Sequence, residues 1–395
     1  MSKPKQFTAA TVIVGLFVLG AVLAAFRSTS RNGSGSNTEP NNAPVVPPIQ
    51  KPSTSWPAYQ NGGEMRGCAS ELPLRQLTLR WELDIGKGAR GSAAIVDRMA
   101  YIGGPLGDVF AIDIKTGLIK WKYTLKTRFI TTPLVYQDAL FIADTSGVMH
   151  SIAIATGQPV WTYETGSDVK SSANRLNDNI YFGAVNGMLY CVNAATGKET
   201  WKVQTDDQVH TTAAIVDGLA FFGGCDAHLR AIDAVSGVQK WAAEMSSQIA
   251  MASVGFDGKV AAGALGGDIV CFSIADGKEV WRRSFEGEEF FSAFAYSDGA
   301  LVAPGRRQGL YCMDGSTGAH RWALESAVGF EAAAVISGQG VYAPGKDGKL
   351  HVLDIKDGKE VWFFAGGGSM DGSPAIGEGV LLVCDASGKL YCLEP

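Results

Sequence analysis

The seven cysteines and five histidines are the residues that would first suggest metal, haem or nucleophilic chemistry. The cysteines form no C-x-x-C, C-x-x-C-H or adjacent pair, which argues against zinc ribbons and c-type haem. The histidines are scattered singly, and no H-E-x-x-H, G-x-S-x-G or EF-hand pattern occurs. A disulfide between Cys68 and a distant cysteine stays open, because sequence does not reveal Cα separations.

A glycine pattern and the net charge bear on phosphate chemistry. Residues 86–91 (GKGARG) match G-x-G-x-x-G but lead into another strand pattern, whereas a dinucleotide site needs a helix whose N-terminus faces the pyrophosphate. The formal net charge of -5 and the absence of any block of like charges provide no basic field for nucleic acid. We therefore predict neither a nucleotide nor a nucleic-acid site.

The elements that would position any site are set by a repeat. Eight of the nine tryptophans recur every forty residues, with one interval of forty-one. They are Trp81, Trp121, Trp161, Trp201, Trp241, Trp281, Trp322 and Trp362. Four residues before each tryptophan from the second onward stands a glycine, which can close a hairpin with positive φ at no steric cost. Two more short apolar runs precede each such hairpin, so each unit predicts four strands.

Four-stranded units at this period are typical of propeller blades. We predict an all-β fold: an eight-bladed β-propeller of four-stranded antiparallel blades over residues 77–395. The chain ends after three strands of a last blade (371–394), while residues 77–85 form a tryptophan strand with no three strands before it. That N-terminal strand is expected to complete the eighth blade and close the ring, which removes exposed sheet edges.

The N-terminal segment has the features of a membrane-targeting sequence. Residues 7–26 form an uncharged apolar run of twenty which, as a helix, would reach roughly 30 Å and span a bilayer core. We predict a signal anchor or transmembrane helix over 1–27, with a cleaved signal peptide as the alternative. Residues 28–55, rich in Asn, Ser, Gly, Thr and Pro, predict a disordered linker, and 56–76 an N-terminal extension. The propeller would then be periplasmic or otherwise extracytoplasmic.

The repeat A-x-D-x-x-T-G-x-x-x-W, intact at residues 111–121, resembles that of the pyrroloquinoline-quinone-like (PQQ-like) propellers, as does the lead-in WPAYQNGGEMRG at 56–67. This family includes quinoprotein dehydrogenases and the outer-membrane assembly lipoprotein BamB. The resemblance implies that the eight tryptophans are structural, each clipping adjacent blades together. It also implies that Cys191, Cys271, Cys312 and Cys392, which occupy the alanine position of the motif, are small packing residues.

The same resemblance implies which features an enzyme of this family should have. A quinoprotein dehydrogenase would be expected to show adjacent cysteines, a calcium site of carboxylates and amides, longer blade insertions and, in some members, a haem motif. The adjacent cysteines, the haem motif and room for insertions are missing here. We predict a protein without enzymatic activity and without a cofactor, and keep PQQ with calcium as the alternative.

The loops after the tryptophan strands should surround one mouth of the central channel. Nine residues after successive tryptophans stand Arg90, Ile130, Lys170, His210, Ala250, Phe290, Glu331 and Asp371, with Arg128, Glu288 and Glu289 close by. Positive or titratable groups thus gather on the first four blades and carboxylates on the last three. We predict that this mouth, with Phe129, Phe290 and Phe330, contacts a protein or peptide. The alternative is that these are merely solvated loop residues.

The sequence therefore predicts a monomeric, membrane-tethered propeller that binds other envelope proteins or peptides, in outer-membrane protein assembly if it works as the assembly lipoprotein does. A quinone-dependent or small-ligand-dependent oxidoreductase is the alternative function. A third is an extracytoplasmic sensor domain, although the chain has no residues left for a cytoplasmic output domain.

Overall fold

The computed structural model describes residues 55–69 and 72–395. The predicted anchor, most of the predicted linker and residues 70–71 lie outside these ranges, so the helix predicted near the N-terminus is not tested. Among the described residues, no helix has the length and hydropathy needed to cross a bilayer.

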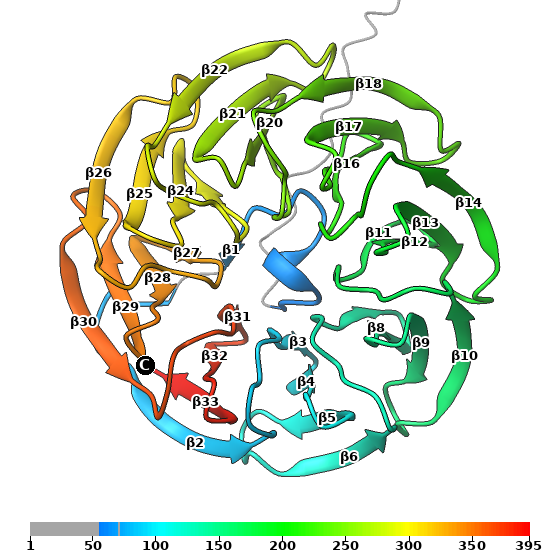
Figure 1. The fold of residues 1–395 in the computed structure, drawn as a ribbon. Helices are drawn as coiled ribbons and strands as arrows, with labels where there is room; N and C mark the ends of the chain where they lie inside the picture. The colour runs from blue at the N-terminus through cyan, green and yellow to red at the C-terminus, as the bar shows by residue number, and fades with distance from the viewer. Residues whose placement is uncertain (1–54, 70–71) are drawn as a thin grey trace, which may run out of the picture. The chain divides into compact units, whose positions relative to one another are not determined.

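Eight sheets form the predicted propeller, and each contains four antiparallel strands with a three-residue strand nearest the centre (Figure 1). One sheet also has a fifth, parallel strand, β1 (Cys68–Ala69). Blades 1 to 4 contain β3 (Ala94–Val96), β4 (Met99–Gly103), β5 (Asp108–Asp113), β6 (Ile119–Thr124); β7 (Leu134–Tyr136), β8 (Ala139–Ala143), β9 (Val148–Ala153), β10 (Pro159–Glu164); β11 (Asn174–Leu176), β12 (Asn179–Gly183), β13 (Met188–Asn193), β14 (Glu199–Gln204); and β15 (Ala214–Val216), β16 (Leu219–Phe222), β17 (His228–Asp233), β18 (Gln239–Glu244).

The other four blades follow the same plan. They contain β19 (Val254–Phe256), β20 (Lys259–Gly263), β21 (Asp268–Ser273), β22 (Glu279–Ser284); β23 (Ala295–Ser297), β24 (Ala300–Pro304), β25 (Gly309–Asp314), β26 (His320–Glu325); β27 (Val335–Ser337), β28 (Gly340–Pro344), β29 (Lys349–Asp354), β30 (Glu360–Ala365); and β31 (Ala375–Gly377), β32 (Val380–Cys384), β33 (Lys389–Glu394) with β2 (Thr78–Asp84).

The last blade combines both ends of the described chain. β2 pairs antiparallel with β33, and Trp81 in β2 lies opposite Cys392 in β33. The inner strand of this blade, β31, lies beside β3 of the first blade. In Figure 1 the blue β2 accordingly lies along the outside of the red strands β32 and β33.

Burial follows from this stacking of sheets. The second and third strands of each blade are buried on both faces, because a neighbouring blade covers each side, and they are accordingly rich in Val, Ile, Phe and Ala. The outer strands alternate between exposed and half-buried residues, since they form the rim. In the third strand, the small residue ten positions before a tryptophan is its cross-strand neighbour, as Cys191 is for Trp201.

The tryptophans contact the next blade. Seven of the eight indole Nε1–H groups donate hydrogen bonds of 2.7–3.2 Å to a backbone carbonyl oxygen in the turn before the next blade's outer strand. The turn glycines have positive φ, as predicted, between 68° and 74°. Each lies against the indole so closely that an added Cβ would be 2.6–2.9 Å from the ring. The glycines therefore serve both the turn and the contact between blades.

Residues 56–67 form a strap across the channel (Figure 1). The strap includes a short 3-10 turn, η1 (Tyr59–Asn61), and continues into β1 (Cys68–Ala69), which pairs in parallel with β27. Backbone N–H groups of six inner strands donate hydrogen bonds of 2.7–2.9 Å to its carbonyl oxygens: Ile95, Val135, Ile215, Gly255, Tyr296 and Ile336. In blade 3 the side-chain amide of Asn174 bonds both backbone groups of Gly63.

Candidate functional site: the channel mouth

The loops that join each outer strand to the next inner strand surround a pocket of about 210 Å³. Seven of the eight residues placed nine positions after the tryptophans line it: Arg90, Ile130, Lys170, His210, Ala250, Glu331 and Asp371. They meet because every such loop starts at the same end of its blade and turns toward the centre. We call this pocket the mouth.

Phe290, the eighth predicted residue, is not in the mouth. The loop between β22 and β23 has ten residues, from 285 to 294, where the other blades have nine. The added residue shifts the register, so that Phe290 is completely buried and packs against Phe285 and Phe294, whereas Phe291 lines the mouth and is 44% exposed. The tryptophan interval of forty-one was the signal that could have revealed this shift.

Phe129 and Phe330 belong to the core as well. Each is 1% exposed, and their rings pack edge-on against His150 and His351 respectively. The prediction that these phenylalanines contact a partner is therefore corrected, because their side chains are inside the fold. Both stand eight residues after a tryptophan, a position that is also buried and apolar in other blades, as at Val169 and Met370.

The charged residues predicted near the mouth, Arg128, Glu288 and Glu289, do not line it, and Glu289 is paired with Arg306 and Arg307. Arg128 is exposed but does not line the pocket. Glu288 is 2% exposed, and its carboxylate accepts hydrogen bonds from the backbone N–H groups of Glu289, Arg307 and Gln308 and from the Tyr311 hydroxyl. Glu288 thus stabilises the β24–β25 hairpin.

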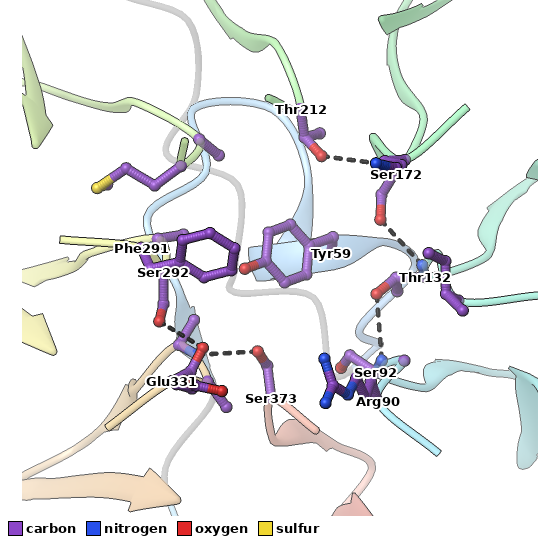
Figure 2. A pocket seen from close by; sticks show the side chains of 18 of the residues that line it. Tyr59, Arg90, Ser92, Thr132, Ser172, Thr212, Phe291, Ser292, Glu331 and Ser373 are labelled. Atoms are coloured by element: carbon purple, nitrogen blue, oxygen red, sulfur yellow. Dashed lines mark hydrogen bonds between the residues drawn. The ribbon is translucent and has the colours of Figure 1, made fainter. Parts of the chain in front are cut away.

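A row of hydroxyl groups beneath the mouth was missed by sequence reasoning. The hydroxyl oxygens of Thr132, Ser172 and Thr212 each accept a hydrogen bond from a backbone N–H of the preceding blade, at 2.9–3.3 Å (Figure 2). Ser373 does the same for Ala333, at 3.0 Å. The signal was a Ser or Thr recurring eleven residues after a tryptophan. These contacts join neighbouring blades.

The floor of the mouth comes from the strap. Tyr59 lines the pocket, and in Figure 2 its ring projects into the middle, with Phe291 to one side and the hydroxyl row to the other. Burial raises the pKa of the Tyr59 hydroxyl, although hydrogen bonds with Ser373 and the Ala293 backbone act in the opposite direction. The phenol is therefore neutral at physiological pH and offers an uncharged aromatic surface.

The two carboxylates of the mouth are paired with cations. Glu331 lies 2.8 Å from Arg306 Nε and 3.1 Å from Lys346 Nζ, while Asp371 lies 3.6 Å from Arg90 Nε. Burial acts to raise the pKa of Glu331, but the hydrogen bonds from Arg306 and Lys346 outweigh it and hold the pKa below 4.5. The acidic side of the predicted charge gradient is therefore largely neutralised.

The basic side of the mouth has fewer ion pairs. Lys170 is exposed and makes no ion pair with any carboxylate of residues 55–69 or 72–395. Nearby, burial and then the positive charge of Lys170 lower the pKa of His210 below 6.5, although Asp207 opposes this. The His210 Nδ1 atom is buried and lacks a hydrogen-bond partner in the described part of the chain.

The donor set of the mouth does not suit a calcium ion. Its carboxylates are each bound by arginine or lysine, and the described residues contain no group of three or more His, Cys, Asp or Glu arranged to hold a metal ion. Cys191, Cys271, Cys312, Cys384 and Cys392 are buried, and burial raises the pKa of their thiols to about 12. These thiols are protonated packing groups at neutral pH.

Solved structures share the fold. BamB from Moraxella catarrhalis has a TM-score of 0.71 at 16% identity, covering 81% of this chain and all of that chain. Quinohemoprotein alcohol dehydrogenase from Comamonas testosteroni has a TM-score of 0.76 at 12% identity, covering 86% of this chain and 80% of its own. A europium-containing methanol dehydrogenase has a TM-score of 0.76 at 12% identity, covering 88% of this chain and 99% of that chain.

No curated protein matches this sequence. The model of one protein family does, in three overlapping segments, 75–184, 176–285 and 265–395, which together contain all eight repeat tryptophans. The description of that family is outer membrane protein assembly factor BamB. The resemblance expected from the repeat is thereby confirmed, and this chain belongs to the BamB family of PQQ-like propellers.

Proposed function

We propose that this chain is a non-catalytic binding scaffold of the cell envelope that takes part in outer-membrane protein assembly. Its N-terminal residues would hold it at a membrane, and its mouth would contact a protein partner. Family membership supports the role in outer-membrane protein assembly. The geometry of the mouth supports its use as the contact surface for a partner. It is the mouth that carries the proposal, since Arg90, Lys170 and Phe291 present exposed charge and an exposed aromatic ring beside one hollow. Exposed aromatic and arginine side chains are typical anchors of protein interfaces.

Site-specific cross-linking in intact cells tests this proposal. A photoreactive amino acid at Lys170 or Phe291 should capture an envelope protein of the outer-membrane assembly machinery, identified by mass spectrometry. The control is the same residue at Lys198, an exposed position in the turn between β13 and β14, at the opposite end of the blade from the mouth. Capture at Lys198 but not at the mouth would reject the mouth as the contact surface.

A quinone-dependent oxidoreductase remains the second candidate, because the dehydrogenase structures share the fold as closely as BamB does. The mouth supports it less well, since its carboxylates are engaged with cations. Titration of the purified chain with PQQ and calcium, followed by absorbance, distinguishes the two. Stoichiometric calcium-dependent binding together with alcohol oxidation would overturn the scaffold proposal.

A further inference from the structure

One side of the mouth presents a lysine without an ion-pair partner among the described residues. Glu331 is shared by Arg306 and Lys346, and Asp371 is paired with Arg90. Lys170 is exposed and lacks such a partner in the described ranges, and His210 lines the mouth on the adjoining blade. A group entering from solvent would therefore gain most by bringing a negative charge to Lys170, because charge-assisted hydrogen bonds are the stronger ones.

The other side of the mouth is apolar. Phe291 is 44% exposed, with the Arg306 guanidinium 4.9 Å from its ring centroid, and Met251 and Tyr59 line the pocket beside it. Covering the exposed part of Phe291 would remove apolar surface from water, which is favourable. An aromatic or branched apolar group would gain this contribution, and a purely polar ligand would not.

The pocket is blind. The strap crosses the channel and is held to the inner strands of six blades by backbone hydrogen bonds, so a ligand enters and leaves through the mouth. At about 210 Å³ the space is smaller than the 300–1,000 Å³ that is usual for drug-sized ligands. It suits one small molecule or the last residue of a chain, and not a chain that passes through.

We propose that the mouth binds an organic carboxylate that bears an aromatic or branched apolar group. The carboxylate binds Lys170, beside His210, and the apolar group packs on Phe291 and Tyr59. Two sources have this chemistry: the C-terminal residue of a polypeptide, and a free small aromatic acid. An N-terminal ammonium group is the wrong end of a chain, because it would meet the unpaired lysine.

This inference deepens the proposed function at the same site and rests on it only where the ligand is a chain end. Calorimetric titration of the purified full-length chain in detergent tests it. The probes are N-acetylphenylalanine, N-acetylphenylalaninamide and a flexible peptide that ends in phenylalanine with a free carboxyl group. The acids should bind, and the amide should bind at least about tenfold more weakly, because it lacks the charge that Lys170 recognises.

Two variants of the mouth and one matched control locate the binding. Lys170→Met should weaken binding of the acid about tenfold and Phe291→Ser about fivefold, with unchanged melting temperatures, since both side chains are exposed. Lys198→Met should change nothing. Peptide binding at least tenfold tighter than that of the small acid identifies a chain end as the ligand, and equal affinity identifies a small acid.

Equal affinity for acid and amide, equal effects of Lys170→Met and Lys198→Met, or no binding of any probe would each overturn the inference. Because the titration uses purified protein and defined probes, its failure leaves the result of cross-linking in cells untouched. Conversely, tight binding of the small acid with no cross-linked partner would support this inference and reject the scaffold.

Discussion

The indoles of seven repeat tryptophans each meet a glycine of the next blade, and this contact leaves no room for a side chain. Trp161 shows it well: its Nε1–H donates to the Ala194 carbonyl oxygen at 2.9 Å, and its ring covers Gly197. A Cβ on Gly197 would lie 2.6 Å from the ring, closer than real contacts allow. Such contacts recur from blade to blade, so single substitutions can measure what they contribute.

Gly197→Ala should destabilise the protein more than Gly166→Ala does. Both glycines have positive φ, 68° and 73°, so both variants suffer backbone strain of about 1 kcal/mol. At Gly166 no atom lies within 4 Å of the added Cβ, whereas at Gly197 the indole must move. We expect an additional loss of about 1–3 kcal/mol in the free energy of unfolding, measured by urea denaturation. Equal losses would show that the indole contact is unimportant.

Trp322→Phe and Trp362→Phe form a second matched pair. The Trp322 Nε1–H donates to the Ile355 carbonyl oxygen at 2.7 Å, whereas the buried Trp362 Nε1 has no partner within the described ranges. Both variants lose ring area, but only Trp322→Phe loses a hydrogen bond. It should therefore cost about 1 kcal/mol more in unfolding free energy, by the same denaturation. An equal cost would mean that the indole hydrogen bond adds no net stability.

Glu331 predicts a pH dependence of stability. Its pKa in the folded protein is held below the ordinary 4.5 by Arg306 and Lys346, so its contribution is present above about pH 4.5 and is lost as the pH falls through the folded value. Glu331→Gln should cost on the order of 1 kcal/mol near neutral pH, and this difference from the parent protein should shrink in acid. A difference that stays constant from neutral pH to about pH 3 would contradict the assignment.

At the scale of elements, the strap is the segment whose role depends most on long-range contacts. Its carbonyl oxygens satisfy inner-strand N–H groups that face the channel, including those of Ile215 and Gly255. Its Tyr59 also forms the floor of the mouth. One short segment therefore both joins blades and makes the pocket blind.

Removal of the strap should expose those amides. In a chain that starts at residue 70, hydrogen exchange at Ile215 and Gly255 should speed up by at least tenfold, because each loses its acceptor. The amide of Leu229 in β17, a completely buried residue of a strand that the strap does not bond, is the internal control. Equal acceleration at all three amides would indicate general destabilisation and not the loss of specific acceptors.

At the scale of the whole molecule, the pairing of β2 with β33 joins the two ends of the propeller. This pairing covers the outer edge of β33 and places Trp81 beside the turn of the first blade, where its Nε1–H donates to the Ile114 carbonyl oxygen at 2.9 Å. Residues near both ends of the described chain thus belong to one blade. A ring joined in this way is expected to unfold as one unit.

Removal of β2 should break this cooperativity. A chain that starts at residue 85 should melt at a lower temperature, in a broader transition, and aggregate through the exposed edge of β33. The control starts at residue 55 and keeps every described residue, including the strap. The chain that starts at residue 85 lacks the strap as well as β2. The chain that starts at residue 70 lacks only the strap, so comparing the two chains isolates the effect of β2. A sharp, unchanged transition without β2 would contradict the expectation.

The sequence by itself determined the repeat, the four strands of each blade, the turn glycines and the loops that form the mouth. These depend on residue type at a fixed spacing, which every blade repeats, so a pattern along the chain is enough to reveal them. The pairing of the N-terminal strand with the last blade followed from counting strands, because three strands remained at the C-terminal end and one at the N-terminal end.

Only the tertiary structure decided which of those loop residues carry the chemistry. Phe290 and Phe291 are adjacent and identical in type, and one added residue in the loop sends the first inward and leaves the second in the mouth. Likewise, Glu331 is neutralised by Arg306 and Lys346, whose positions in the sequence do not reveal that they converge on it. Burial and ion pairing depend on distances between separate blades, and a linear pattern carries no such distances.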